Sequence, residues 1–246
     1  ESTYGNKTHD KSDVLDDIES VINRTTRRGG TVLIPAFAVG RTQHILYAIY
    51  LLKKAGRISD VPVYLNSPMA IDATELFLKH RGEHRLNDTQ CAEMAQVATY
   101  VQSVQESKEL DRKEGPMIII SASGMATGGR VLHHLRALAP YQKNTILFTG
   151  FQAEGTRGRS IIQGARSVKI HGIEVPINAE VHTLDNLSAH ADKDEILKWL
   201  SHFSGSPKKV FVVHGEESAS EALKNEIEAT FGWPVVVPHL NDSFDL

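Results

Sequence analysis

The stretch that decides the fold is Thr31-Val32-Leu33-Ile34-Pro35, together with the segment 42–55 that follows it. Residues 31–35 form a short apolar run, which predicts a buried strand. Residues 42–55 carry apolar side chains at helical spacing, namely Ile45, Leu46, Ile49 and Leu52. An apolar strand followed by an amphipathic helix is the repeating unit of a parallel α/β sheet.

The same alternation continues on both sides of this unit. A helix precedes it and ends at Gly29-Gly30, with apolar positions at Val14, Leu15, Ile18, Val21 and Ile22. Further strands are expected at 61–65, 116–120 and 145–149, and further helices at 70–80, at 131–138 and near Ser160. The pattern therefore predicts an α/β fold with a mainly parallel, doubly wound, Rossmann-like sheet flanked by helices.

Two segments depart from this alternation. Residues 83–109 are polar and mostly helical, which predicts a lid or an insertion on the outside of the sheet. Residues 169–175 and 178–184 have alternating apolar and polar side chains and are separated by Pro176. They predict an antiparallel pair of strands.

Composition sets the broad class of protein. The 246 residues are 41% hydrophobic and 23% charged, with a formal net charge of -3. These values are ordinary for a globular protein, and any polyanion must therefore be bound by local positive charge. The single cysteine, Cys91, excludes an intramolecular disulfide and favours a reducing compartment, for which we expect the cytoplasm. No apolar run approaches the roughly 20 residues of a membrane span.

Three strand ends share a loop with glycine or serine, then an arginine, then a helix. The arginines are Arg41, Arg130 and Arg157. Such a loop exposes backbone N–H groups at a helix N-terminus, and a guanidinium can bind a phosphate with two hydrogen bonds. Alternatively, the glycines serve tight turns and the arginines pair with acids such as Glu154. The chain has neither a P-loop lysine motif nor a Gly-x-Gly-x-x-Gly after the first strand, which disfavours mononucleotide-binding enzymes.

Two histidines sit at polar turns near the C-terminal end, His190 in Ser188-Ala189-His190-Ala191-Asp192 and His214 in Val212-Val213-His214-Gly215-Glu216. An amphipathic helix at 194–200 and an apolar strand at 209–213 lie between them. A unit of this length brings the start of the helix and the end of the strand to one edge of a sheet. We expect both imidazoles in one cleft, one as a metal ligand and one as a proton carrier. Alternatively, both are capping or loop histidines, and Asp192 is the N-cap of the helix.

Five motifs occur in order along the chain: Glu1-Ser2-Thr3-Tyr4-Gly5, Ile34 to Arg41, Ser121-Ala122-Ser123-Gly124-Met125, Ser188-Ala189-His190 and Val213-His214-Gly215-Glu216. Together they resemble the β-CASP branch of the metallo-β-lactamase superfamily, which holds RNA-processing nucleases related to the pre-mRNA cleavage endonuclease and to ribonuclease J. The resemblance spans essentially the whole chain. It implies a β-CASP domain at 5–187, with 1–4 and 188–246 belonging to a metallo-β-lactamase domain.

The resemblance also implies roles for single residues. Glu1 matches the acidic motif of the family and would orient His190, the general acid. His214 would be a zinc ligand, and two zinc ions would activate a hydroxide and bind the phosphodiester. Ser188 is a candidate donor to a substrate phosphate, as are the three arginines of the strand-end loops.

The chain departs from the family in one respect. The main zinc motif, His-x-His-x-Asp-His, is formed by none of the 12 histidines. The only adjacent pair, His133-His134, lies in a predicted helix and is expected to be exposed or half-buried rather than a ligand. Because catalytic zinc needs about three protein ligands, we expect the C-terminal portion of a longer enzyme, one that does not bind zinc tightly at two sites.

The expected partners are single-stranded RNA, the missing N-terminal metallo-β-lactamase portion, and a second copy of the chain. The function expected from the resemblance is that of a zinc-dependent ribonuclease, to which this chain contributes part of the active site. The alternative is a non-catalytic RNA-binding lobe or an inactive scaffold paralogue. The presence of Glu1, His190 and His214 together favours the ribonuclease.

Overall fold

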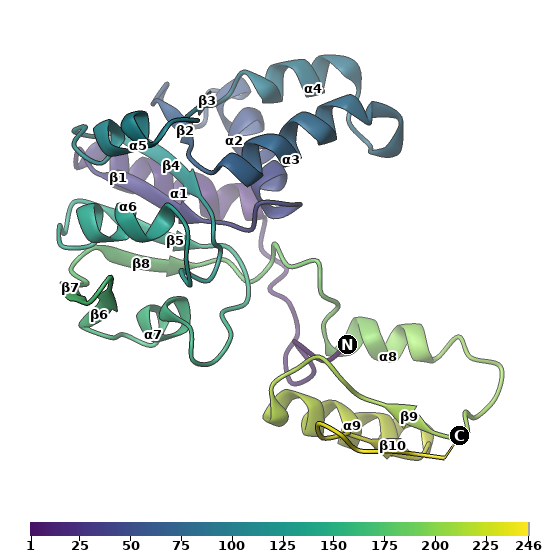
Figure 1. The fold of residues 1–246 in the computed structure, drawn as a ribbon. Coiled ribbons are helices and arrows are strands. Elements are labelled where there is room, and N and C mark those ends of the chain that lie inside the picture. The colour runs from purple at the N-terminus through teal and green to yellow at the C-terminus, as the bar shows by residue number, and fades with distance from the viewer. Residues whose placement is uncertain (246) are drawn as a thin grey trace. The chain divides into compact units, whose positions relative to one another are not determined.

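A computed structural model describes residues 1–245; residue 246, the last of the predicted segment 188–246, lies outside the described residues (Figure 1). The chain divides into two compact units. One is Ser12–Leu187, and the other joins Glu1–Lys11 to the segment that begins at Ser188. This second unit therefore includes residues 5–11 in addition to the predicted residues 1–4.

The unit Ser12–Leu187 is built on a six-stranded sheet with the order β3-β2-β4-β1-β5-β8. Its strands are β1 (Thr31–Pro35), β2 (Val63–Leu65), β3 (Thr99–Tyr100), β4 (Met117–Ser121), β5 (Thr145–Phe148) and β8 (Glu180–Thr183). Every neighbouring pair is parallel, as in the register that places Leu33 opposite Ile119. The predicted mainly parallel sheet is confirmed.

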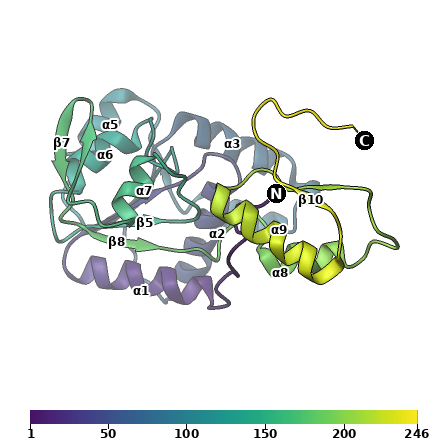
Figure 2. The same cartoon turned by 90° about the horizontal axis from the view of Figure 1, so that it is seen from below.

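Helices cover both faces of this sheet (Figures 1 and 2). They are α1 (Val14–Arg27), α2 (Arg41–Lys54), α3 (Pro68–Lys79), the 3-10 helix at Arg81–Glu83, α4 (Asp88–Ala95), α5 (Val104–Leu110), α6 (Val131–Leu138) and α7 (Arg157–Ile162). Successive strand residues point to opposite faces. Accordingly, Val32 and Ile34 pack with α1 to α4, whereas Leu33 packs with α5 to α7.

The predicted insertion at 83–109 is in part an element of the sheet. It contains α4 and most of α5, as its polar helical pattern predicted. It also contains β3, which pairs with β2 at the edge of the sheet. The segment is therefore anchored by backbone pairing at its centre.

The predicted antiparallel pair of 169–175 with 178–184 is wrong. The hairpin instead joins β6 (Ser167–Ile170) to β7 (Ile173–Pro176), and Glu180–Thr183 joins the main sheet in parallel beside β5. The turn of the hairpin is His171-Gly172, whose φ angles are 48° and 81°. A two-residue turn with positive φ at both positions matches the twist of the flanking strands.

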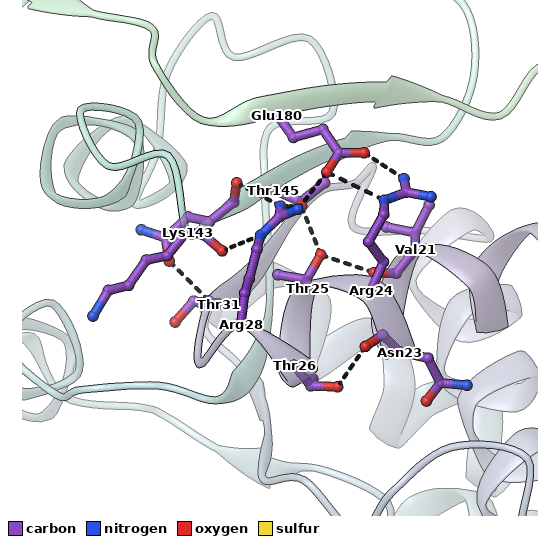
Figure 3. A network of polar contacts seen from close by, with 11 residues as sticks. Val21, Asn23, Arg24, Thr25, Thr26, Arg28, Thr31, Lys143, Thr145 and Glu180 are labelled. Atoms are coloured by element: carbon purple, nitrogen blue, oxygen red, sulfur yellow. Dashed lines mark hydrogen bonds and ion pairs between the residues drawn. The ribbon is translucent and has the colours of Figure 1, made fainter.

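Polar contacts hold the edge strand β8 in place (Figure 3). Arg24 of α1 and Arg28, the C-cap residue of that helix, both form ion pairs with Glu180, the latter at 2.7 Å. Arg28 also donates to the hydroxyl oxygen of Thr145 on β5 at 2.6 Å. Burial raises the pKa of Glu180, but hydrogen bonds from the two guanidinium groups outweigh this and lower it below its ordinary value.

The second unit is smaller. It contains α8 (Lys193–Leu200), β9 (Val210–Phe211), α9 (Glu217–Phe231) and β10 (Val235–Val236), with the two strands in parallel. Its core is formed by Leu200, Val212, Leu223, Ile227, Trp233 and Val235. The N-terminal segment joins this unit through a backbone bridge between Tyr4 and Asp192. Across residues 1–245, no helix combines the length and apolar character that crossing a membrane requires.

Candidate active site in the smaller unit

Three predicted site residues meet in the smaller unit. His190 lies in the turn before α8, and His214 follows β9. Nδ1 of His190 lies 2.8 Å from Oε2 of Glu1, and Nδ1 of His214 lies 3.4 Å from the same oxygen. The two imidazole rings are stacked, with centroids 5.3 Å apart.

The loop that carries His214 is shaped for this position. His214 has a φ of 62°, in the left-handed region that non-glycine residues rarely adopt. A Cβ atom on Gly215 would lie 2.4 Å from Oγ of Ser2, so only glycine fits there. Ser2 in turn donates to the carbonyl oxygen of Val213 at 2.9 Å. Close packing between the N-terminal segment and this loop thus places Glu1 beside His214.

Thr3 belongs to the site as well, although sequence reasoning missed it. Its backbone N–H donates to Oε1 of Glu1 at 2.7 Å. Its hydroxyl donates to the carbonyl oxygen of His214 at 3.2 Å. Both oxygens of the Glu1 carboxylate are therefore engaged, one by Thr3 and one by His190. Its position two residues after the motif glutamate was the available signal.

These contacts determine the charge of Glu1. Burial raises its pKa, but the hydrogen bonds from His190 and from the Thr3 N–H outweigh burial and lower the pKa from 4.5 to about 2. The carboxylate is therefore ionised at neutral pH and accepts the Nδ1–H of His190. This bond leaves Nε2 of His190 as the atom that can carry a proton to or from another group.

Two groups of side chains in the smaller unit could offer ligand atoms to a metal. Among residues 1–245, histidine and carboxylate ligand atoms gather in two groups of three, Glu1 with His190 and His214, and His9 with Asp192 and Glu195. Imidazole nitrogen and carboxylate oxygen are ordinary zinc ligands. In the first group, Nδ1 of His190 and Nδ1 of His214 both face Oε2 of Glu1, at 2.8 and 3.4 Å, so either imidazole would bind a metal through Nε2.

The turn before α8 has a structural aspartate. Oδ1 of Asp192 accepts from the backbone N–H of Glu195 at 2.9 Å, and the Glu195 side chain accepts from the N–H of Asp192 at 3.0 Å. This is a capping box, so the N-cap alternative for Asp192 is confirmed. Ser188 also has a local partner, since its Oγ accepts from the backbone N–H of His190 at 3.2 Å.

The three strand-end arginines all lie in the larger unit and contact backbone carbonyl oxygens there. Arg41 donates to Leu187. Arg130 donates to the carbonyls of Val101 and Gln102 and to the side-chain oxygen of Asn66. Arg157 donates to the carbonyl of Lys169 at 2.7 Å, with longer contacts to Ala126 and Thr127. The hydrogen bonds of Arg130 and Arg157 are thus to main-chain and amide oxygens.

His134 is fully buried, which corrects the expectation that the His133-His134 pair is exposed or half-buried. Its Nδ1–H donates to Asp111 at 2.5 Å, and its Nε2 accepts from the side-chain amide of Asn66 at 2.7 Å. His133 is exposed, as expected. Both residues belong to the larger unit.

The fold and the site together define an α/β protein with a carboxylate that contacts one histidine and lies close to a second. Comparison with known families agrees with this class. Residues 42–161 match the family described as the Beta-Casp domain. Residues 174–238 match the family described as the Zn-dependent metallo-hydrolase RNA specificity domain.

Named relatives point the same way. The chain is 38% identical to a ribonuclease of Thermus thermophilus, over 91% of this chain and 52% of the relative. It is 33% identical to the transcription termination factor FttA of Thermococcus kodakarensis, over 100% of this chain and 40% of the relative. It is 33% identical to an RNase J-like protein of Methanocaldococcus jannaschii, over 88% of this chain and 50% of the relative. The chain thus spans about half or less of these relatives.

The chain belongs to the β-CASP family of the metallo-β-lactamase fold.

Proposed function

We propose that this chain supplies part of the active site of a zinc-dependent ribonuclease that hydrolyses RNA phosphodiester bonds. The observation that carries the proposal is the Glu1 carboxylate, which contacts His190 at 2.8 Å and lies 3.4 Å from His214. A ribonuclease among the relatives and the RNA specificity family support RNA as the substrate. We expect single-stranded RNA.

In this proposal His190 is the general acid. The ionised carboxylate of Glu1 accepts the Nδ1–H and orients the ring, so that Nε2 donates a proton to the departing oxygen. An imidazole suits this task because its ordinary pKa lies near neutrality. Thr3 is a positioning residue that holds the second oxygen of Glu1.

His214 would hold zinc. When bound, zinc would act as a Lewis acid toward the phosphodiester and generate a hydroxide from water. Because a catalytic zinc needs about three protein ligands, we propose that further ligands come from a metallo-β-lactamase segment outside these residues, and that the intact site holds two ions. The 246-residue chain alone is then expected to retain little zinc and to be inactive.

The two compact units support the proposed division into domains. We propose that 5–187 is the β-CASP domain and that 1–4 and 188–246 belong to the metallo-β-lactamase domain. We also propose that Ser188, Arg41, Arg130 and Arg157 contact the RNA phosphates, that two copies of the chain can associate, and that the protein works in the cytoplasm.

The test compares two alanine variants of the full-length protein. His190→Ala should keep its zinc and lose about 10²–10⁴-fold in kcat, the usual contribution of general acid–base catalysis. His214→Ala should lose both zinc and activity. The measurements are metal analysis after dialysis and cleavage of RNA with an ordinary and with an activated leaving group.

An activated leaving group needs no proton, so it should rescue His190→Ala but not His214→Ala. Equal zinc loss in the two variants, or no rescue of the first, would refute the assigned roles. RNA binding with no cleavage by the unsubstituted protein would favour the non-catalytic RNA-binding lobe or the inactive scaffold.

A further inference from the structure

The segment Tyr4–His9 is hydrogen-bonded to the turn that carries His190. The backbone N–H of Lys193 donates to the carbonyl oxygen of Lys7 at 3.1 Å. The backbone N–H of His9 donates to Oδ2 of Asp192 at 2.8 Å. Both partners belong to the same compact unit. The segment therefore fixes the start of α8, and the turn before it, from the outside.

His9 also reaches His190 itself. Its Nε2 lies 2.8 Å from the carbonyl oxygen of His190. A carbonyl only accepts, so Nε2 of His9 must carry the hydrogen, and this settles its tautomer. The ring of Tyr4 packs edge-on against the His9 ring, with centroids 4.7 Å apart, and restricts its orientation.

His190 is consequently held at three points. Its backbone N–H donates to Ser188 at 3.2 Å, its carbonyl oxygen accepts from His9, and its ring donates to Glu1. Of these, only the contact from His9 comes from outside the turn and acts on the backbone. Without this contact, the peptide group that follows His190 would be less restrained. The position of the imidazole would then be less restrained as well.

A metal site is the competing interpretation of His9, because its ligand atoms gather with those of Asp192 and Glu195. The carboxylates are already engaged, however. Asp192 accepts from the N–H groups of His9 and Glu195, and Glu195 accepts from the N–H of Asp192. Ligation would have to compete with these bonds, so the contacts favour a structural clamp.

We propose that His9 is a positioning residue for the general acid, which it serves by holding the carbonyl oxygen of His190. This inference rests on the function proposed above. Small displacements of a catalytic group are costly, since about 1 Å of misplacement can lower a rate roughly 10²-fold. The expected signature is a loss in kcat without a change in KM.

The test uses His9→Phe and His9→Gln in the full-length protein. Phenylalanine keeps a ring against Tyr4 but has no donor, whereas glutamine keeps an N–H donor. His9→Phe should lower kcat by about 10- to 100-fold, and His9→Gln should recover most of this loss. The matched control is His202→Phe, because His202 also donates to a backbone carbonyl, that of Lys198 at 2.7 Å, at an exposed position outside the site.

Two further measurements separate positioning from general damage. The loss in His9→Phe should shrink on a substrate with an activated leaving group, and it should vanish in a His190→Ala background. In the 246-residue chain, NMR should show the Nδ1–H proton of His190 exchanging faster in His9→Phe than in His202→Phe.

Three results would overturn the inference: an unchanged kcat in His9→Phe, an equal loss on both substrates, or no recovery in His9→Gln. If His190→Ala itself leaves the rate unchanged, the proposed function fails. If His190→Ala is impaired while His9→Phe is not, only the role of His9 fails.

Discussion

The carboxylate of Glu1 sets the electrostatics of the candidate site. It accepts from His190 and from the Thr3 N–H, and these bonds outweigh burial to give a pKa of about 2. An anion held in this way fixes the tautomer of His190 with Nδ1 protonated. This leaves Nε2 of His190 as the atom that a general acid would use for proton transfer.

Substitution of Glu1 by glutamine should change how stability depends on pH. As pH falls, the unfolded chain takes up the proton near pH 4.5 and the folded chain only near pH 2. The contribution of the carboxylate to stability is therefore present in full above about pH 4.5 and is lost between there and pH 2. Because the Glu1 side chain is 34% exposed, we expect at most about 1 kcal/mol.

Denaturant unfolding of Glu1→Gln, followed by tryptophan fluorescence at pH 7 and at pH 2 to 3, would check this. The variant should be the less stable at pH 7, and the difference should narrow in acid. A difference that is constant, or that grows as pH falls, would show that the carboxylate contributes through something other than its charge.

Among the elements of the larger unit, His134 links three that are distant in sequence. It lies on α6 and donates to Asp111 at the end of α5, while Asn66 after β2 donates to it. Asn66 in turn accepts from Arg130 at the start of α6 at 2.7 Å. Both ring nitrogens of His134 and both polar atoms of the Asn66 amide have partners, which is the condition for such a network to stabilise a core.

Removing His134 should therefore cost much more than removing its neighbour. His134→Ala leaves Asn66 and Asp111 without their partner and should destabilise the unit by about 3 kcal/mol. His133→Ala is the matched control on the same helix, because His133 is exposed and the helix propensity changes equally. It should change stability by less than about 0.5 kcal/mol. Thermal unfolding by circular dichroism would measure both, and equal effects would contradict the role assigned to His134.

Periodicity predicted the elements whose environment is uniform. The strand 31–35 was found because a parallel sheet covered on both faces requires its strands to be apolar throughout. The helix near 42–55 was found because it must present an apolar face to that sheet. Periodicity failed for Glu180–Thr183, because an alternating strand fits an antiparallel pair and the edge of a parallel sheet equally well. The ion pairs of Arg24 and Arg28 with Glu180 distinguish the two arrangements, and they span more than 150 positions of sequence.

The candidate site was predictable to a similar degree. Glu1, His190 and His214 each lie in a recognisable motif, and the structure brings them together. Thr3 and His9 were missed because their roles depend on contacts with residues some 180 to 210 positions away. The burial of His134 was missed for the same reason, since its partners lie in other elements.

At the scale of the whole molecule, the two units differ in the size of their cores. Ser12–Leu187 buries two large apolar clusters, one on each face of a six-stranded sheet. Its two ends are joined by Asn186, whose side-chain amide donates to the carbonyl oxygen of Ser12 at 3.2 Å. The smaller unit has about 70 residues and a core of six buried side chains. Domains of that size are marginally stable on their own.

This difference predicts that the smaller unit unfolds first. Both tryptophans, Trp199 and Trp233, lie in the smaller unit, so tryptophan fluorescence reports only on that unit. The circular dichroism signal comes mainly from the helices and strands of the larger unit. In a denaturant titration, the fluorescence transition should therefore occur at a lower concentration than the circular dichroism transition.

A chain of residues 12–187 is the control for this prediction. It lacks tryptophan and should show a single circular dichroism transition, with a midpoint close to that of the second transition of the complete chain. Its ends should stay together through Asn186 and Ser12, so that removing the other unit opens no strand of the sheet. Coincident fluorescence and circular dichroism transitions in the complete chain would instead show that the two units unfold as one cooperative body.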